Sequence, residues 1–351
     1  MNASITISDR RIGAGLPTYV IAELSANHNQ DFEQAVKLIL AAGQAGADAV
    51  KLQTYTPDTI TIDCDAPPFR IGKGTQWEGR NLYELYAEAY TPWEWQPKLK
   101  SIANDCGMAL FSSPFDDTAV DFLETMDVPA YKIASFELVD LPLIARVART
   151  GQPVILSTGM ATPEEIGEAV GCVRENGNEQ IALLKCTSAY PAPVDEMNLR
   201  AIEHLSSRFA VPVGLSDHTL GTAIPMIAVS LGACIIEKHF TLSRAIPGPD
   251  STFSLEPHEF KEMVDAIRTA ERALGTVDYV GGTHEEPSKR FRRSLFIVKD
   301  MGAGERFTPE NVRSIRPADG LAPKHLSEVL GKRAAFALRR GTPLAWDAIT
   351  E

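Results

Sequence analysis

The sequence predicts an α/β fold in which a (β/α)8 TIM barrel is followed by a small C-terminal domain. Eight short apolar runs alternate with helical patterns over about 270 residues, as in a closed parallel barrel. Several of these runs end in a charged residue, where a buried strand should have none. The alternation stops near Gly275, and short strands divided by glycine and proline follow. An open doubly wound sheet is the alternative, but no G-x-G-x-x-G follows the first strand to favour it.

The expected strands carry charges near their carboxyl ends. The strands lie near residues 19–24, 48–53, 108–112, 129–134, 153–157, 181–186, 211–215 and 233–237. The charged residues within or beside them are Glu23, Lys51, Lys132, Lys185 and Glu237. An unpaired charge in such a layer costs several kcal/mol. Because the carboxyl ends of barrel strands share one mouth, we expect these charges to surround a charged ligand there.

Helical patterns fill the intervals between the strands. Residues 32–45 place Phe32, Val36, Ile39, Leu40 and Gly43 along one face at helical spacing, and a glycine at position 46 ends the helix. A second helix opens with Thr162 as N-cap and Pro163 in its first turn.

One interval is long, because residues 54–107 hold an insertion after the second strand. Long insertions at this place usually shape the substrate mouth of a barrel. The alternative is a packing helix built around Tyr83, Tyr86 and Trp95.

The predicted domains are a barrel at residues 1–275, a linker at 276–291 and a C-terminal domain at 292–351. The last segment carries eleven Lys and Arg against seven Asp and Glu, a net charge of +4 that leaves −16 for the rest. This asymmetry fits a basic cap that lies on an acidic body, its own or a partner's. Chance surface charge is the alternative.

Composition narrows the class of protein. A formal charge of −12 without a long basic run argues against a nucleic-acid partner. Five scattered cysteines without a CxxC pair indicate neither a disulfide framework nor a zinc knuckle, and they favour the reducing cytoplasm. The segment MNASITISDRRIG has no apolar signal core, and no run approaches the ~20 apolar residues of a membrane span. We expect a cytoplasmic protein with no membrane partner.

Two histidines are candidate metal ligands. In IIEKHF, side-chain alternation puts Glu237 and His239 on one face and Lys238 on the other. His218 follows the preceding strand, so both imidazoles would lie at the same mouth. Two imidazoles with a nearby carboxylate suit a divalent cation, Mn²⁺ or Mg²⁺. Asp217 is placed to orient a ligand. A lone histidine is more often an ordinary hydrogen-bonding residue.

Lysines and hydroxyls indicate an anion site. Lys51 and Lys132 lie inside apolar strands, where a lysine serves as an anion anchor or as a Schiff-base nucleophile. Hydroxyls stand at equivalent strand ends: Ser112, Ser113, Ser135, Ser157, Thr158 and Ser216. Ammonium and hydroxyl groups that converge on one point suit phosphate and carboxylate, although single hydroxyls are common in turns. Lys185 either joins this set or pairs with an acid.

Glu23 ends the first strand and is followed by Asn27, His28 and Asn29 in the loop. A carboxylate there could orient or deprotonate water, or act on a sugar hydroxyl. For Asn29 we favour a plain turn residue.

Eight motifs, which follow one another in a fixed order along the chain, resemble those of a known family. AELSANHN, GADAVKLQTY, FSSPF, YKIASFE, STGMAT, KCTSAYP, GLSDHT and IEKHFTL resemble the sialic acid synthase (NeuB) family, and RSIRPADGLAP resembles its antifreeze-like (SAF) domain. LSANHN, KLQTYTPDTITID, KCTSAYP and STFSLEP are closer to the pseudaminic acid branch than to the N-acetylneuraminate branch. Gln30 replaces a frequent glycine, and Ser188 stands where N-acetylneuraminate synthases often have asparagine.

The resemblance implies a reaction and a set of roles. Phosphoenolpyruvate (PEP) would condense with an open-chain acetamido aldose, water would add at C2, and phosphate would leave by C–O cleavage. PEP would be held by Lys51, Lys132, Ser113, Ser135, Ser157 and Ser216. A divalent metal on His218 and His239 would polarise the aldehyde, and Glu23 or Glu237 would handle water and protons. Gln53, Tyr190 and Asp250 match positions that bind sugar hydroxyls.

The resemblance also implies a partner. The SAF domain would reach the other subunit of a domain-swapped homodimer, where Arg316 would contact an acyl group of the sugar. In the pseudaminic acid branch the sugar is 2,4-diacetamido-2,4,6-trideoxy-L-altrose. In the N-acetylneuraminate and legionaminate branches it is N-acetylmannosamine or a bacillosamine-derived relative.

Two other classes remain. A non-enzymatic SAF-domain binding protein would not need Glu23, Lys51, Lys132, His218, Glu237 and His239 together. A Schiff-base aldolase would use free pyruvate, and borohydride would trap the imine that a lysine forms with pyruvate.

Overall fold

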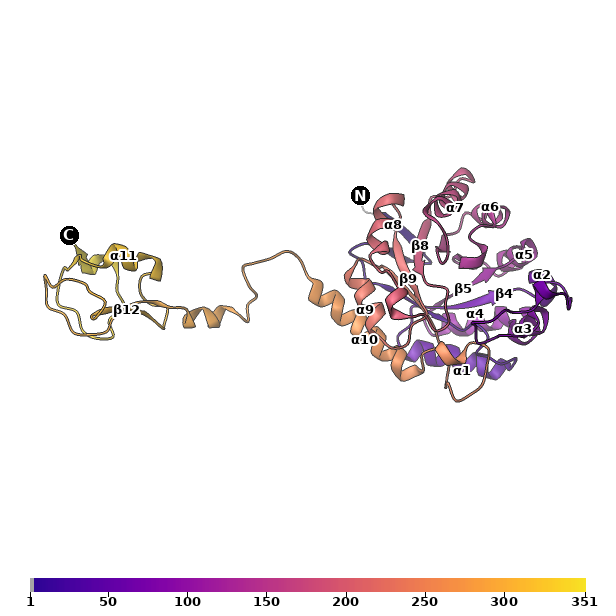
Figure 1. Cartoon of the computed structure of the whole chain (residues 1–351), viewed down its shortest axis with the longest axis horizontal. Helices are drawn as coiled ribbons and strands as arrows, with labels where there is room; N and C mark the ends of the chain where they lie inside the picture. The colour runs from indigo at the N-terminus through magenta and orange to yellow at the C-terminus, as the bar shows by residue number, and fades with distance from the viewer. Residues whose placement is uncertain (1–2) are drawn as a thin grey trace. The chain divides into compact units, whose positions relative to one another are not determined.

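The computed structural model describes residues 3–351 and divides the chain into two compact units that meet between Gly275 and Thr276. The first unit is a closed barrel of eight parallel strands, each paired with its neighbours in chain order (Figure 1). Its strands are β3 (Tyr19–Glu23), β4 (Ala49–Thr54), β5 (Ala109–Pro114), β6 (Tyr131–Ile133), β7 (Val154–Ser157), β8 (Ile181–Cys186), β9 (Val213–Asp217) and β10 (Ile235–His239). The predicted barrel is confirmed. The last two strands run two residues further than expected, to Asp217 and His239.

The register sets the polar side chains beside one another. β3 lies between β10 and β4, so Glu23 is level with both His239 and Lys51. On the other side of β10, Glu237 is level with Ser216 of β9. Because side chains alternate along a strand, all of these point to one face of the sheet.

Helices surround the strands (Figure 1). They are α1 (Phe32–Gln44), α4 (Gln96–Asp105), α5 (Asp117–Thr125), α6 (Leu141–Ala148), α7 (Pro163–Glu175), α8 (Ala201–Phe209), α9 (Ala223–Ser230) and α10 (Pro257–Leu274). The predicted start of α7 is confirmed, because the Thr162 hydroxyl accepts from the Glu165 N–H in a capping box.

The expected face of α1 is partly wrong. The buried residues are Ala35, Leu38, Ile39 and Ala42, whereas Leu40 is 42% exposed. Small alanines rather than Leu40 therefore pack against the barrel. The helix ends as expected, with a glycine at position 46 in the left-handed region.

The insertion after β4 contains α2 (Pro57–Ile60), α3 (Leu82–Ala89) and two short 3₁₀ turns, one before α3 (Pro67–Phe69) and one that leads into α4 (Trp93–Trp95). Two of the three residues named for the packing alternative pack against aromatic rings: Trp95 lies edge-on to His28 and Phe32, and Tyr86 lies edge-on to Tyr55. The third, Tyr83, instead donates its exposed hydroxyl to Asp58 at 3.1 Å. The segment around Trp77 is different and belongs to the mouth described below.

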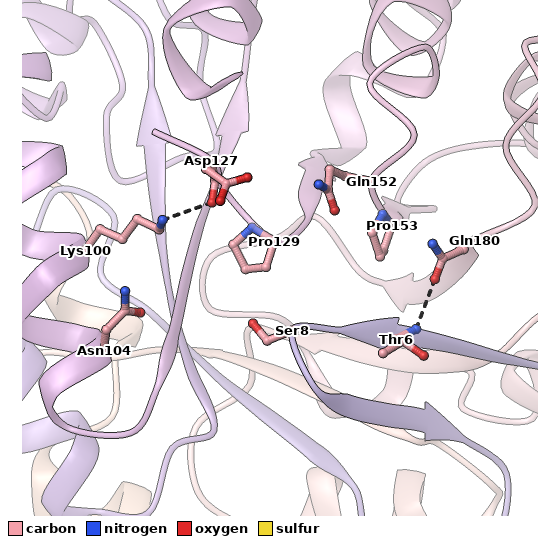
Figure 2. Close-up of a pocket in the computed structure, with 9 residues that line it drawn as sticks. All are labelled: Thr6, Ser8, Lys100, Asn104, Asp127, Pro129, Gln152, Pro153 and Gln180. Carbon is pink, nitrogen blue, oxygen red and sulfur yellow. Dashed lines mark hydrogen bonds between the residues drawn. The ribbon is translucent and has the colours of Figure 1, made fainter. Parts of the chain in front are cut away.

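An N-terminal hairpin precedes the barrel and was not expected from the sequence. It consists of β1 (Ser4–Ile7) and β2 (Arg10–Gly13), and it buries Ile5, Ile7 and Ile12 in the main core. A cavity of about 490 Å³ lies between this hairpin and the loops that lead into β6, β7 and β8 (Figure 2). It is lined by Thr6, Ser8, Lys100, Asn104, Asp127, Pro129, Gln152, Pro153 and Gln180. Since these loops precede the strands, the cavity lies at the end of the barrel opposite the charged mouth.

The second unit has its own small core. It contains β11 (Ser294–Ile297) paired with β12 (Val312–Ile315), the short helix α11 (Leu326–Val329), and β13 (Arg333–Ala334) paired with β14 (Ile349–Thr350). Leu295, Phe307, Val312 and Leu344 are almost fully buried in it. Within residues 3–351, no helix is both long enough and apolar enough to cross a membrane.

Candidate active site

Four buried charges meet inside the mouth of the barrel. The ammonium of Lys51 lies 2.8 Å from a Glu23 carboxylate oxygen and 3.6 Å from Glu237, and that of Lys132 lies 3.8 Å from Glu237. All four side chains are at most 5% exposed. Oε2 of Glu23 is the oxygen that pairs with Lys51, whereas Oε2 of Glu237 accepts no hydrogen bond from the part of the chain described here. The cluster therefore keeps an unused acceptor as well as two cations.

The two carboxylates differ in acidity. Burial raises the pKa of Glu23 to about 7, with Lys51 opposing and Glu237 adding to the rise. Burial also favours the neutral form of Glu237, but Lys132 and Lys51 outweigh it and hold the pKa of that carboxyl below its usual value. Glu23 is thus able to exchange a proton near neutral pH, whereas Glu237 stays ionised.

Hydroxyl groups surround the lysines. Ser113 accepts a hydrogen bond from Lys51 at 3.3 Å, and Ser216 donates one to Glu237 at 2.9 Å. Ser135 accepts from the Gly159 N–H at 3.1 Å. The buried hydroxyl of Ser157 has no hydrogen-bond partner among residues 3–351. An unpaired buried hydroxyl is costly, so Ser157 suits a ligand oxygen.

Ser112 does not belong to the site. Its hydroxyl bonds to Thr54 at 2.6 Å, on the face of the sheet that the helices cover. The alternation along β5 explains why only Ser113 of the Ser112–Ser113 pair faces the lysines.

The two histidines lie side by side. Their ring centroids are 5.3 Å apart, and the rings are 4% and 8% exposed for His218 and His239. Nδ1 of His218 lies 3.0 Å from the Thr187 carbonyl, so it carries the proton and leaves Nε2 free to act as a ligand. Nδ1 of His239 lacks a hydrogen-bond partner among the described residues. Burial holds the pKa of His239 well below its usual value, so its ring is neutral, as a metal ligand must be.

These nitrogen donors fit a divalent cation, with one difference from expectation. No group of three or more His, Cys, Asp or Glu side chains is arranged to hold a metal within residues 3–351. Glu237 is instead engaged by Ser216 and the lysines. A cation on His218 and His239 would complete its shell with water and substrate oxygens.

Two residues lie elsewhere than expected. Asp217 does not orient a histidine, because it accepts hydrogen bonds from Thr219 and from Lys238, at 2.5 Å, on the outer face of the strands. Among residues 3–351, Lys185 forms no ion pair with an acid, and its ammonium does not contact Glu23 or Glu237. Its ammonium donates to the Cys186 carbonyl at 2.7 Å and to the Thr187 hydroxyl at 3.2 Å.

The expected sugar ligands from the barrel lie on the other side of Glu23 and beside the histidines. The Gln53 amide donates to Glu23 at 3.0 Å and to Ser25 at 3.1 Å, and Ser25 donates to Asp250. The Tyr190 ring lies against that of His218, tilted by 44°, with ring centroids 4.3 Å apart. Arg316 is exposed after β12 in the second unit, and its role stays a prediction.

Trp77 extends this aromatic group toward the surface. Its ring centroid lies 5.6 Å from that of Tyr190, and its indole N–H donates to the Pro249 carbonyl at 3.0 Å. Gln76 donates to the same carbonyl at 2.9 Å. The insertion thus meets the loop after β10 over the mouth, as the substrate-mouth interpretation of this segment expects.

Sequence reasoning missed Glu137 and Cys186. Oε2 of Glu137 is buried and has no hydrogen-bond partner in residues 3–351, and burial raises the pKa of this carboxyl to about 7. Burial alone would raise the pKa of Cys186, but His218, Ser135 and Ser188 lower it to about 6. Glu137 could have been found as the acid two residues beyond Ser135.

Asn27, His28 and Asn29 in the loop after Glu23 hold neighbouring segments in place. Asn27 donates to the Phe240 carbonyl and to Ser254, both at 2.9 Å. Nε2 of His28 lies 3.0 Å from the Thr91 hydroxyl, and Nδ1 of the same ring accepts from the Gln30 N–H. Asn29 donates to the Pro247 carbonyl at 3.1 Å. Oδ1 of Asn27 is buried and has no hydrogen-bond partner within residues 3–351.

With this geometry established, comparison with known proteins assigns the family. A model described as the NeuB family matches residues 38–279, and a SAF domain model matches residues 292–350. The chain belongs to the NeuB family. The barrel, the charged mouth and the C-terminal unit are therefore those of a NeuB-family chain with a SAF domain.

Individual relatives refine the comparison of this NeuB-family chain. Pseudaminic acid synthase of Helicobacter pylori is 46% identical over 334 residues, which cover 95% of this chain and 98% of that protein. N,N'-diacetyllegionaminic acid synthase of Legionella pneumophila is 37% identical over 342 residues, which cover 96% of each. A crystal structure of N-acetylneuraminic acid synthetase from Leptospira borgpetersenii in complex with citrate gives a TM-score of 0.73 at 31% identity, covering 82% of this chain and 95% of that chain.

Proposed function

We propose that this NeuB-family chain is a pseudaminic acid synthase, which condenses PEP with 2,4-diacetamido-2,4,6-trideoxy-L-altrose and releases phosphate. The observation that carries the proposal is the inner cluster, in which the ammonium groups of Lys51 and Lys132 lie 3.6 Å and 3.8 Å from the Glu237 carboxylate. PEP is a compact polyanion with a phosphate and a carboxylate, and ammonium groups with hydroxyls bind both. The 46% identity to the Helicobacter pylori enzyme supports the choice of sugar.

The proposed mechanism begins with positioning. Lys51, Lys132, Ser113, Ser135, Ser157 and Ser216 bind PEP, while Gln53, Tyr190 and Asp250 hold the open-chain aldose beside it. Fixing two reactants in this way removes much of the entropic barrier to a carbon–carbon bond. C3 of PEP attacks the aldehyde carbon, and the aldehyde oxygen takes up a proton. Water adds at C2, and the resulting tetrahedral carbon expels phosphate by C–O cleavage.

A divalent metal belongs to the proposal. His218 and His239 would hold it, and it would supply Lewis-acid polarisation of the aldehyde when bound. Mn²⁺ suits the mixed nitrogen and oxygen donors best, with Mg²⁺ as the alternative. The neutral His239 ring supports this assignment, as does its Nδ1 atom, which has no hydrogen-bond partner among residues 3–351. The contact of His218 Nδ1 with the Thr187 carbonyl directs Nε2 of that ring to the cation.

We assign the proton exchange to Glu23. Its raised pKa, about 7, lets the carboxyl donate to the new alkoxide or accept from water near neutral pH. It also lies between Lys51, on the PEP side, and Gln53, on the sugar side. Glu237 stays ionised and balances the charge of the two lysines.

A homodimer with exchanged SAF domains completes the proposal. Large apolar side chains are exposed on the loops after β6, β7, β8 and β9: Phe136, Met160, Val194 and Leu220. Exposed apolar side chains on four loops support a protein contact there, and a second copy's SAF segment of charge +4 complements the remainder of charge −16. Arg316→Ala should then weaken sugar binding while PEP binding survives. Equal loss of both in a folded dimer would count against that role.

We also propose a cytoplasmic location, which the five unpaired cysteines support. The proposed function is tested by phosphate release from PEP with Mn²⁺ or Mg²⁺ against each candidate aldose. Release with the 2,4-diacetamido-2,4,6-trideoxy-L-altrose substrate supports the assignment. Preference for N-acetylmannosamine or the legionaminate precursor would move the chain to another branch. Borohydride trapping of pyruvate without phosphate release would replace the proposal by a Schiff-base aldolase.

A further inference from the structure

Ser25 has an unusual backbone for its residue type. It is 3% exposed and has a φ of +45°, in the left-handed region where a residue with a Cβ is disfavoured. Strain of this kind persists where the surroundings fix it, often at a functional site. Glycine would relieve the backbone at this position, so the presence of serine directs attention to its hydroxyl.

The Ser25 hydroxyl joins two sugar-side residues. It donates to the Asp250 carboxylate and accepts from the Gln53 amide at 3.1 Å. The same Gln53 amide donates to Glu23 at 3.0 Å, and Glu23 forms an ion pair with Lys51 at 2.8 Å. One continuous polar string therefore runs from the PEP side, through the proton-exchanging carboxylate, to the sugar side.

Asp250 depends on this hydroxyl for its orientation. It belongs to the loop after β10, 225 residues away from Ser25 along the chain. The other contact to its carboxylate in the described structure is the Ala26 N–H at the long distance of 3.5 Å. Burial raises the pKa of Asp250, and the Ser25 hydrogen bond opposes that rise. Without the hydroxyl, both the direction and the charge of the carboxylate lose support.

We propose that Ser25 is a positioning residue that holds Gln53 and Asp250 in the geometry required by the aldose. This inference rests on the proposed function, because it takes Gln53 and Asp250 as sugar ligands. Ser25 acts through these two residues, so its removal should affect the aldose and leave the PEP half of the site in place.

The test compares Ser25→Gly with Ser8→Gly. Ser8 also has a positive φ, +51°, but it is exposed in the β1–β2 turn at the other end of the barrel. The two changes remove the same atoms and share the same backbone effect, in which relief of strain opposes the added freedom of the unfolded chain. Ser8→Gly therefore isolates the contribution of the Ser25 hydroxyl.

Steady-state phosphate release is measured with each substrate varied in turn. We expect Ser25→Gly to raise the KM for the aldose about 3- to 10-fold, as for a lost hydrogen bond, with the KM for PEP within about twofold of wild type and a Tm close to that of Ser8→Gly. Ser8→Gly should leave both KM values unchanged. An unchanged aldose KM in Ser25→Gly, or an equal rise in both KM values, would overturn the inference alone. Absence of phosphate release by the wild-type protein would overturn the proposed function and this inference with it.

Discussion

Buried charges lie on both faces of strands β9 and β10, yet the two faces differ in how those charges are satisfied. On the outer face, Lys238 and Asp217 are fully buried and paired at 2.5 Å, and Lys238 also donates to the Thr219 carbonyl. On the inner face, Glu237 and Lys132 are 3.8 Å apart, and Oε2 of Glu237 has no hydrogen bond from residues 3–351. The charges of the outer pair are satisfied by each other and by hydrogen bonds, whereas the inner cluster has hydrogen-bonding groups that remain available to a ligand.

The comparison shows that burial alone does not mark a functional charge. A buried charge without complete hydrogen bonding costs free energy, and a ligand can recover that cost. The outer pair carries no such cost for a ligand to offset, because its charges are already paired. We therefore interpret it as a structural connection between β9 and β10. The inner cluster is the part of the barrel where an anion would be stabilised.

The largest effect is expected on the outer face. Lys238→Met leaves Asp217 buried without its cation, which should lower the free energy of unfolding by about 3–5 kcal/mol. Thermal denaturation would show this loss, while the KM values stay near wild type at temperatures where the variant is folded. The double variant Asp217→Asn with Lys238→Met should recover most of the stability, because no lone charge remains. A Lys238→Met protein that is stable but inactive would contradict the claim that the outer pair serves stability and only the inner cluster serves activity.

The inner face should respond in the opposite way. Lys132→Met removes one cation from the anion site and should lower kcat/KM for PEP about 10²- to 10³-fold. Burial lowers the pKa of Lys132, so its charge is already unfavourable and the Tm should change little. Kinetics and thermal denaturation on the same preparation test both parts. A large loss of stability with a normal KM for PEP would mean that Lys132 serves the fold.

The Glu23 carboxyl predicts a stability that depends on pH. Its folded pKa of about 7 exceeds the ordinary 4.5, so the folded protein holds this proton more tightly than the unfolded chain. The resulting stabilisation is complete below about pH 4.5 and is lost as pH rises through 7. The free energy of unfolding of Glu23→Gln should therefore rise by about 1–3 kcal/mol relative to that of wild type as pH increases across this interval. Above the interval the difference between the two proteins should stay constant.

Denaturant unfolding at several pH values measures that difference. Glu262→Gln, on an exposed part of α10, is the control and should show a difference that does not vary in this way. A Glu23→Gln curve parallel to the wild-type curve from pH 4.5 to 8 would contradict the raised pKa.

The smallest effect is expected at the rim of the mouth. Trp77→Phe keeps a ring beside Tyr190 but loses the hydrogen bond to Pro249, so the KM for the aldose should rise about 2- to 5-fold. Trp93→Phe loses an equivalent indole hydrogen bond, to the Tyr55 carbonyl, and is the matched control. Equal kinetic effects of the two changes would show that Trp77 has no specific role in aldose binding at the mouth.

Much of this arrangement could be predicted from the sequence. The regular spacing of apolar runs predicts all eight barrel strands. Side-chain alternation predicts that Lys238 lies on the opposite face from Glu237 and His239. The same rule would have excluded Ser112. Since neighbouring strands share one mouth, the meeting of Lys51, Lys132 and Glu237 also followed from local pattern.

Other features depend on contacts that local pattern does not encode. The hydrogen bond between Ser25 and Asp250 joins residues 225 positions apart on two loops. The position of Trp77 depends on a loop that docks on Pro249. The four-residue strands of the N-terminal hairpin are too short to give a strong periodic signal.

Calorimetric titration of PEP is the most direct test of the central claim, which is that the incompletely bonded inner charges form the anion site. The titration uses wild type, Lys132→Met and the Asp217→Asn, Lys238→Met double variant. We predict dissociation constants within about threefold for wild type and the double variant, and at least about tenfold weaker binding for Lys132→Met, as for a lost hydrogen bond to a charged group. Equal PEP affinity in all three proteins, or weaker binding in the double variant alone, would contradict the account.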